Sequence, residues 1–542
     1  MSATSHILEQ LETLNAIGRA LSSERDLRSL LERILEAAQG FAHADGGTLY
    51  LVRDGELVFE VIRNETLGFR LGGRSGGPIR FPPVPLFDAE GRPLGGTVVA
   101  HAAHTGQTVN IADAYAAEGY DFSGTRAFDE LNGYRSRSFL TVPMKDHAGS
   151  VIGVLQLINA RDPDGRVRPF SREEQSLVES LASQAAIALN NRQLIVQMEN
   201  LFESLINLIN RAIDEKSPYT GGHCERVPVL TMMLAEATER TRAGPLAGFR
   251  MDDRDRYELK IAGLLHDCGK ITTPVHVVDK ATKLQTLFDR IELLETRWEI
   301  LHRDNEIALL RGQIDQATHD ARREQLDRDL EMIRRSNIGG EFFEDDKVQR
   351  VHEIARGRWR THLGEERPVL TEDEVENLCI RRGTLTRKER DIINHHIVVT
   401  IDMLERLPWP PHLRRVPEFA GGHHERMDGK GYPRGLTREQ MSVQARIMGI
   451  ADIFEALTAA DRPYKNGKTL SEALTILGRM KLDHHIDPDL FDVFIRERVY
   501  LRYARRFLPP EQIDRIDWSS IPGVSAELAA EMSARDAAEG KV

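Results

Sequence analysis

The sequence predicts a multidomain protein in which an α+β domain is joined by a long helix to a second, larger domain. Three observations lead to this prediction. The chain has 542 residues, more than one hydrophobic core of roughly 250–300 residues can organise. Its first third changes from helical to alternating periodicity, which indicates helices combined with strands. The stretch 171–213 then keeps a helical pattern without any Pro or Gly.

Composition and charge exclude several classes of protein. Hydrophobic residues make up 41% and charged residues 29%, and the formal net charge of −12 argues against general binding to nucleic acid or anionic membranes. The N-terminal segment does not resemble a signal peptide, and no window approaches about 18 uninterrupted apolar residues. Only three cysteines occur, without CxxC spacing. We therefore expect a cytoplasmic protein that binds neither nucleic acid nor membrane, and any metal site should use His and Asp.

The first domain begins with an amphipathic helical pattern at 7–38 and continues with strands. The sequence "GGTLYLVRDGELVFEVIRN" alternates apolar and polar residues around Asp54-Gly55, a strong hairpin signal. Further strands are expected at "QTVNIAD", "SFLTVPMKD" and "SVIGVLQLINA", with a turn at 147–149 between the last two. This order predicts an antiparallel sheet flanked by helices.

The run "FDELNGYRSRSFLTVPMKDHAGSVIGVLQLINARDPDGRVRPFSREEQSLVESLASQAAIAL" resembles a GAF domain, a small-ligand and signalling module, so we expect a GAF sensory domain at 1–190. Cyclic-nucleotide-binding members carry Asn-Lys, then Phe, then Asp-Glu. Asn159 and Phe170 match, whereas Ala160 and Glu174-Gln175 depart from the signature. The domain is expected either to bind a small ligand or to serve only as a dimerisation platform.

A connecting signalling helix is predicted at 171–215. A helix of about 40 residues would be about 60 Å long, which is unusual inside one globular domain. We expect it to pair with its copy in a homodimer. Two shorter helices with a kink are the alternative.

The second domain is predicted at 216–510, with a helical insertion at about 285–380 and a C-terminal tail at 511–542. The insertion is densely charged, with apolar residues three or four apart, which indicates a solvated helical hairpin rather than a core. A lid over the site is one possible role for it, and a merely solvated surface is the other.

Histidines and aspartates recur around this insertion in five separate segments. "YTGGHCERV" contains His223, "LLHDCGK" contains His266-Asp267, "INHHIVVTIDML" contains His395-His396, "GGHHERMDGKGYP" contains His423-His424, and "IMGIADIFEALT" contains Asp452. Each segment alone is weak evidence. Together they suit a divalent cation, which stabilises several buried polar groups at once, and an imidazole and carboxylate set favours an open hydrolytic site. Neighbouring residues on a helix differ by about 100° in direction, so adjacent ligands can serve different coordination positions.

"HDCGK" resembles the signature of the HD superfamily of metal-dependent phosphohydrolases. "HHERMDGKGYP" followed by "DIFEALTAADRPYK" is similar to the HD-GYP subgroup, whose members hydrolyse cyclic di-GMP. The resemblance implies an all-α domain with two divalent metal ions, of which iron or manganese is favoured. Carried over position by position, it implies Asp267 as the bridge between the ions and these metal ligands: His223, His266, Asp267, His396, His423, His424 and Asp452.

Two positions refine this ligand set. His396 is chosen over His395 because the family places its ligand four residues before a small residue, which matches Thr400, although Gly is usual there. Some members carry a Glu associated with a third metal four residues before the first His. Tyr219 holds that place here, so two metals are expected.

The resemblance also implies the groups that act on substrate. Two close cations can activate a water between them, so the nucleophile is hydroxide and not a side chain. Asp267 and Lys270 are the expected catalytic residues, and Glu425 is an acid that could orient a neighbouring ligand. The glycines of "GYPRG" are expected to let the backbone approach a ligand. The expected substrate-binding residues are Lys270, Arg462 and Lys465 at the phosphates and Gly431, Tyr432 and Pro433 at the pocket wall.

The function implied is a metal-dependent phosphodiesterase that opens cyclic di-GMP to linear pGpG, and to GMP if the reaction continues, under control of the GAF domain. One alternative is a binding protein that senses cyclic di-GMP without turnover. Another is hydrolysis of a different cyclic dinucleotide.

Overall fold

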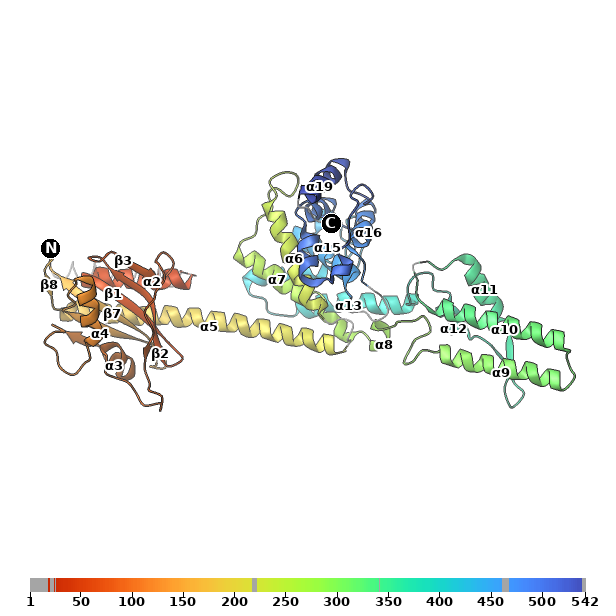
Figure 1. Ribbon diagram of the computed structural model, residues 1–542, viewed down its shortest axis with the longest axis horizontal. Coiled ribbons are helices and arrows are strands. Elements are labelled where there is room, and N and C mark those ends of the chain that lie inside the picture. Colours follow the sequence, from red (N-terminus) through yellow and green to blue (C-terminus); the bar gives the residue numbers. More distant parts are fainter. Residues whose placement is uncertain are drawn as a thin grey trace. The chain divides into compact units, whose positions relative to one another are not determined.

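The structure is a computed structural model that describes residues 18–19, 24, 26–216, 222–340, 342–460 and 467–538. The chain divides into two compact units, Met1–Phe202 and Glu203–Val542. Figure 1 shows a sheet in the first unit and helices in the second. The predicted fold class, an α+β domain joined by a long helix to a helical domain with a helical insertion, is confirmed.

The first unit contains an antiparallel sheet with the strand order β3-β2-β1-β7-β6-β5. Short strands β4 and β8 pair with β2 and β7. The strands are β1 (Ala44–Arg53), β2 (Glu56–Asn64), β3 (Phe69–Gly72), β4 (Val84–Pro85), β5 (Val109–Ile111), β6 (Phe139–Lys145), β7 (Val151–Arg161) and β8 (Val167–Arg168). Strands β1, β2, β5, β6 and β7 lie in the segments expected to be strands, whereas β3, β4 and β8, of two to four residues, were not expected.

The hairpin between β1 and β2 has the tight turn that Asp54-Gly55 predicts. Asp54 and Gly55 have φ angles of 48° and 80°, and such left-handed pairs match the twist of the flanking strands. The turn sets Arg53 opposite Glu56, and an irregularity between Leu49 and Tyr50 shifts the register so that Leu49 lies opposite Val61 in the core.

Helices cover both faces of the sheet. On one face, α2 (Leu27–Ala42) and the first part of α5 (Arg172–Lys216) bury Leu35 and Leu181 against Leu157. On the other, α3 (Val98–Thr105) packs Val99 against Tyr50, and α4 (Ser123–Asn132) follows. The predicted helix at 7–38 is seen as α2, and most of its earlier part lies outside the described residues.

Helix α5 runs for 45 residues as one element. It contains neither Gly nor Pro, so nothing in its sequence favours the kinked alternative. None of the helices in the described ranges, α5 included, has both the length and the apolar composition that a membrane span requires.

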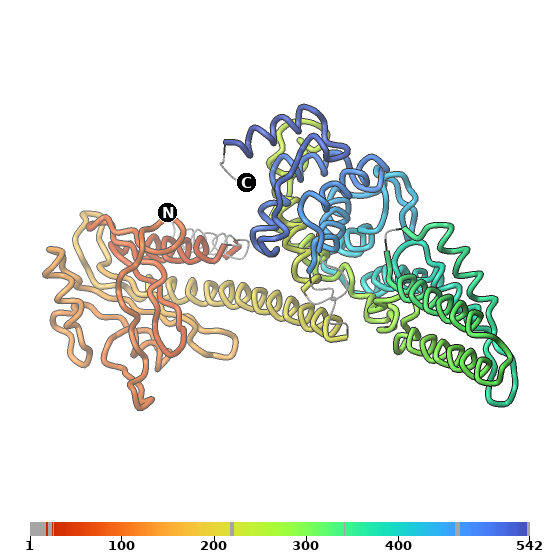
Figure 2. The backbone as a smooth tube through the Cα atoms, turned by 45° about the vertical axis from the view of Figure 1, so that its right-hand side comes forward, coloured from red at the N-terminus to blue at the C-terminus, as the bar shows by residue number. Residues whose placement is uncertain are grey.

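The second unit is built from helices, and Figure 2 follows their path from green to blue. Helix α6 packs against α7 and α15, and α13 packs against α14. The helices outside the insertion are α6 (His223–Arg240), α7 (Asp253–Leu265), α8 (Val275–Val278), α13 (Arg387–Glu405), α14 (Val416–Gly421), α15 (Val443–Thr458), α16 (Leu470–Leu482), α17 (Pro488–Arg496), α18 (Val499–Phe507) and α19 (Ala526–Ala538).

The insertion has a core of its own, which differs from the expected solvated hairpin. It comprises α9 (Ile291–Leu310), α10 (Gln316–Asn337), α11 (Asp345–Ala355), the hairpin of β9 (Arg358–Arg360) and β10 (Glu366–Pro368), and α12 (Glu372–Leu378). Trp298 and Leu294 of α9 are buried with Ile333 of α10 and Val351 of α11. The charged hairpin α9–α10 is present as expected. Its inner face, however, packs against α11 and neighbouring short elements. The apolar patterns of these elements are too short to have predicted a core.

The segment expected to be a C-terminal tail also packs on its domain. Trp518, Leu528 and Met532 are buried, and Trp518 Nε1 donates to Asp536 at 2.8 Å. These apolar residues are too widely spaced for a periodic signal, so only the fold reveals that the domain continues past residue 510.

Candidate metal centre

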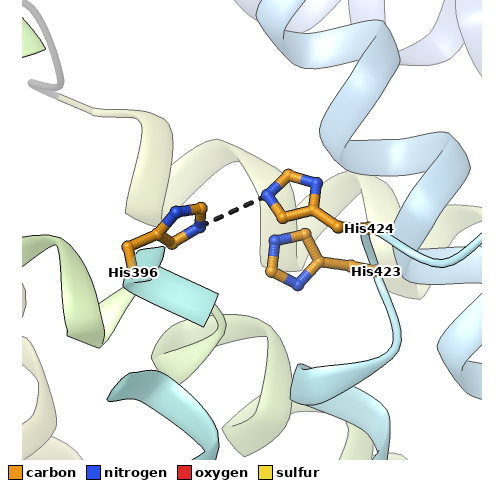
Figure 3. A group of neighbouring side chains, drawn as sticks. All are labelled: His396, His423 and His424. Atoms are coloured by element: carbon orange, nitrogen blue, oxygen red, sulfur yellow. Dashed lines mark hydrogen bonds between the residues drawn. The ribbon is translucent and has the colours of Figure 1, made fainter. Parts of the chain in front are cut away.

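The seven His and Asp residues predicted as ligands converge within the second unit. His223 begins α6, His266 and Asp267 follow α7, His396 lies in α13, His423 and His424 follow α14, and Asp452 lies in α15. They form two groups, each with ligand atoms within 4.8 Å of one another: His223, His266, Asp267 and Asp452, and then His396, His423 and His424. Figure 3 shows the second group, with the three rings turned toward one another.

The adjacent ligands lie at helix ends and not within helices. His266 is the C-cap of α7, and His423 and His424 lie in the turn after Gly421, where α14 ends. The expected 100° step along a helix therefore does not set their directions. The end of a helix frees the backbone to turn, so the side chains spread where the chain changes course.

Three of the histidines are oriented by the same hydrogen bond. The Nδ1 atoms of His266, His396 and His423 lie 2.7, 2.5 and 2.6 Å from the carbonyl oxygen of the residue three positions earlier. A carbonyl oxygen only accepts, so Nδ1 donates. In the neutral ring Nε2 then keeps its lone pair, and such a bond fixes the tautomer that a metal ligand needs.

The carboxylate of Asp267 lies between the two groups. Its Oδ2 is 3.1 Å from His223 Nε2 and 3.3 Å from His266 Nε2. Its Oδ1 is 3.2 Å from His396 Nε2 and 4.0 Å from His423 Nε2. Each oxygen thus faces one group, which is the arrangement expected of a carboxylate that bridges two ions.

Buried polar atoms at the centre lack hydrogen-bond partners. Among the described residues, neither Asp267 Oδ1 nor His423 Nε2 has one, and both side chains are at most 2% exposed. A buried acceptor without a partner costs free energy, about 1–3 kcal/mol. A divalent cation at each group would pair these atoms, so the residues present fit a metal centre.

The two groups differ in charge. Although burial opposes ionisation, the Lys270 ammonium holds the pKa of Asp267 well below its ordinary value. Burial and the neighbouring His424 hold the pKa of His423 well below its ordinary value, and burial lowers the pKa of His424 to about 4. Asp267 of the first group is therefore ionised, whereas His423 and His424 of the second group are held neutral.

Glu455 is a buried residue of the centre that the sequence motifs did not identify. It is hydrogen-bonded to His223 Nδ1, and its other oxygen accepts from Arg226 Nε at 2.7 Å. Glu455 follows Asp452 by three positions on α15, so both lie on one face of the helix. That spacing is the signal that could have identified it.

Lys270 lies at the centre in contact with Asp267. Its Nζ is 2.5 Å from Asp267 Oδ2, and the short helix Cys268–Thr272 carries it back toward the carboxylate. Two other predicted phosphate ligands, Arg462 and Lys465, lie outside the described residues, as does Tyr219.

The "GYPRG" loop reaches the centre through Tyr432, whose ring stacks on His424 at a centroid distance of 4.9 Å. Pro433 follows it through a cis peptide bond. At Gly431 an added Cβ would lie 2.4 Å from Arg426 N. This glycine therefore lets the loop pack closely against the chain's own backbone.

Glu425 also has a different role from the expected one. It is buried and accepts from the backbone N–H groups of Arg434 at 2.7 Å and Leu436 at 2.8 Å. It therefore closes the loop, and no hydrogen bond joins it to a histidine among the described residues.

The choice of His396 over His395 agrees with the packing of α13, because His396 is buried and His395 is exposed. Thr400, one turn further, accepts from Gly269 N at 3.0 Å. At Gly269 an added Cβ would lie 2.1 Å from His396 O. The close contact that holds the Asp267 turn against α13 thus depends on Gly269, and Thr400 fits beside it.

Family profiles match both units. The GAF domain profile matches residues 26–189, and two HD domain profiles match 220–330 and 372–490. The gap between the HD matches overlaps the insertion.

Among curated proteins, 3'3'-cGAMP-specific phosphodiesterase 3 of Vibrio cholerae is 25% identical over 57% of this chain and 40% of its own length. Cyclic di-GMP phosphodiesterase of Thermotoga maritima is 39% identical over 22% of this chain and 32% of its own. The chain thus spans less than half of these relatives. A solved GAF domain/HD domain protein from Geobacter sulfurreducens covers 32% of this chain and 98% of its own length, at 18% identity and a TM-score of 0.24.

Proposed function

We propose that this chain, in which a GAF domain precedes an HD domain, is a metal-dependent phosphodiesterase that hydrolyses cyclic di-GMP to linear pGpG. The observation that carries the proposal is the Asp267 carboxylate, which directs one oxygen to each of two groups of potential ligands. Relatives named as cyclic di-GMP and 3'3'-cGAMP phosphodiesterases support the reaction class.

In this proposal the seven residues of the two groups hold two divalent cations, with Asp267 between them. Two such cations would supply an activated water and neutralise charge on the phosphodiester. The protein's own contribution is a buried and ordered site. Nδ1 hydrogen bonds direct the rings of His266, His396 and His423, and Glu455 directs that of His223.

Nitrogen and oxygen donors without thiolate suit Fe, Mn, Co or Zn, and the resemblance to the HD-GYP subgroup favours iron or manganese among them. Two cysteines adjoin the ligands, but burial raises the pKa of Cys224 to about 12 and that of Cys268 to about 11. Neither thiol belongs to the two groups whose ligand atoms lie within 4.8 Å of one another.

Around this centre we assign substrate contacts to Lys270, Arg462, Lys465 and Tyr432. The ammonium of Lys270 is the described cation nearest to Asp267, and a bound metal at Asp267 would repel it toward a phosphate. The stacked ring of Tyr432 forms a wall beside His424. Gly431 and Pro433 hold this wall in place.

A second candidate substrate is 3'3'-cGAMP, because two relatives from Vibrio cholerae carry that specificity in their names. The second of them is 46% identical over 81 residues.

Turnover of cyclic di-GMP and 3'3'-cGAMP by the same metal-loaded preparation, followed by chromatography of the linear products, tests which of the two is the substrate. Cyclic di-GMP should be cleaved faster. Preference for 3'3'-cGAMP would reassign the substrate, and binding without product from either would indicate a sensor.

We further propose that α5 forms a parallel homodimer. Large apolar residues recur every seven positions at Ile187, Leu194, Leu201 and Leu208, and each is 45–64% exposed. A second series four positions later contains Asn191, Met198, Leu205 and Ala212. This is the a/d pattern of a coiled coil with leucines at d, and a single Asn at a favours a two-stranded parallel register.

Regulation by the GAF domain would pass through α5, and the signature residues of that domain support a structural role. Asn159 accepts from Arg137 N at 2.7 Å and donates to Tyr134 at 2.9 Å, and Phe170 is buried in the core. Both therefore maintain the domain itself. This favours a dimerisation platform over a cyclic-nucleotide site.

A further inference from the structure

A groove lined by arginines lies at the base of the insertion. Its volume is about 510 Å³, and its walls come from α12, the start of α13 and the segment around Phe342. We call it the arginine groove and define it by Phe342, Glu376, Arg382, Leu385, Arg387 and Arg390. A volume of this size fits a small-molecule ligand.

The walls of the groove are held by backbone hydrogen bonds. Phe343 N donates to Arg381 O at 2.9 Å, and Gly383 N donates to Gly340 O at 3.0 Å. Thr386 caps α13, and Glu389 closes the capping box. The arginines of the groove are therefore presented by a defined backbone.

Positive charge is concentrated here, in a chain whose net charge is −12. Arg381, which also lines the groove, pairs with Asp345. In the described ranges no salt bridge involves Arg382, Arg387, Arg390 or Glu376, and Arg390 Nη2 donates to Arg382 O at 3.5 Å. Three guanidinium groups without an acidic partner around one groove form a cationic surface that a multivalent anion would neutralise.

The remaining lining indicates more than a simple anion. The ring of Phe342 is 62% exposed at the groove, and Leu385 adds apolar surface beside it. An aromatic face stacks with a planar base, and a carboxylate such as Glu376 accepts hydrogen bonds from ring and exocyclic N–H groups.

We propose that the arginine groove binds a purine nucleoside polyphosphate. The phosphates lie among Arg382, Arg387 and Arg390, the base stacks on Phe342, and Glu376 accepts from the base. Guanine suits this contact because its edge carries two neighbouring kinds of N–H donor. This site is separate from the metal centre, and it does not depend on the reaction proposed there.

Isothermal titration of the full-length protein with GDP tests the proposal, with pyrophosphate and guanosine as partial probes. GDP should bind more tightly than either. The adjacent cations Arg387 and Lys388 provide a matched pair, because each loses one charge on substitution but only Arg387 lines the groove. Arg387→Ala should weaken GDP binding about fivefold or more, and Lys388→Ala less than about twofold.

Phe342→Ala should weaken the binding of GDP and leave that of pyrophosphate unchanged. His423→Ala should leave GDP binding intact, which separates the groove from the metal centre. Circular dichroism checks that each variant folds. The proposal is overturned if GDP does not bind, if pyrophosphate binds as tightly as GDP, if Lys388→Ala weakens binding as much as Arg387→Ala, or if His423→Ala abolishes it.

Discussion

His423 and His424 lie in the turn after α14, with ring centroids 4.0 Å apart and planes tilted by 45°. They are neighbours in sequence but have different surroundings. His423 is fixed by Ala420 O and faces Asp267, whereas His424 lies between His396 and the ring of Tyr432. Because the two histidines are adjacent in this turn, the turn provides two potential metal ligands that point in different directions.

Substitution of His423 tests its assignment as a ligand. We expect His423→Ala to lower bound metal, measured by elemental analysis of protein purified without oxygen. Its affinity loss should exceed the about 10- to 100-fold typical of residues that only support a ligand. His395→Ala, on the same helix as His396 but exposed, should retain full metal content. Equal metal content in both variants would contradict the assignment.

Glu455 is hydrogen-bonded to His223, and its substitution should lower the affinity for metal. Glu455→Gln removes the charge that supports Nδ1 of His223 and the partner of Arg226. We expect metal affinity to fall about 10- to 100-fold, measured by competition with a chelator. Glu439→Gln changes an exposed glutamate and should have no effect. A lower melting temperature with unchanged metal affinity would indicate a purely structural residue.

Among the secondary-structure elements, α5 could be predicted from the sequence, whereas the core of the insertion could not. The 45-residue helix was predictable because its period continues without a helix breaker. The core of the insertion was not, because Val351, Val369 and Leu370 come from short elements that meet Trp298 only in the fold. A high density of charged residues indicates that the outer face of a helical hairpin is solvated, but it does not show whether the inner face is buried.

The dimer proposed for α5 predicts position-specific effects. Leu201→Glu and Leu208→Glu place charges in the seam and should shift the protein from dimer to monomer in sedimentation experiments. Asn200→Glu, one position from the seam, adds the same charge outside it and should leave the dimer intact. Monomeric wild-type protein, or equal effects of Leu201→Glu and Asn200→Glu, would refute the heptad register.

A buried lysine just before the insertion has a predictable effect on the pH dependence of stability. Burial lowers the pKa of Lys283 from its ordinary 10.5 to about 8, although its Nζ donates to Leu378 O at 3.0 Å and lies 3.9 Å from the ring of Phe343. Below pH 8 both folded and unfolded states are protonated, so folding bears the full cost of the buried charge. Between pH 8 and 10.5 only the unfolded state stays protonated, so this residue's contribution to the free energy of unfolding rises with pH.

Lys283→Met isolates this contribution. The difference in urea midpoint between the wild type and Lys283→Met should move in favour of the wild type from pH 8 to pH 10.5. The full change is on the order of 3 kcal/mol. A difference that stays constant across this range would show that Lys283 keeps its proton when folded.

At the scale of the whole molecule, the sequence predicted the two-domain organisation and brought together the seven residues of the centre. The sequence motifs predicted His423-His424 and His266-Asp267 as metal ligands. They could not show that these residues lie where helices end. Glu455, the closing role of Glu425 and the packed C-terminal segment all depend on contacts between residues distant in sequence. Such contacts have no periodic signal.

The proposed function requires that both groups of ligands hold metal and act on one phosphodiester. The most direct measurement is single-turnover hydrolysis of cyclic di-GMP by full-length protein loaded anaerobically with Mn²⁺ or Fe²⁺, followed by chromatography. We expect linear pGpG from the wild type, loss of product with a chelator and its return when metal is restored. We also expect loss of product in Asp267→Asn, which removes the charge between the groups. Metal-loaded protein that binds cyclic di-GMP and releases it unchanged would refute the proposed hydrolysis.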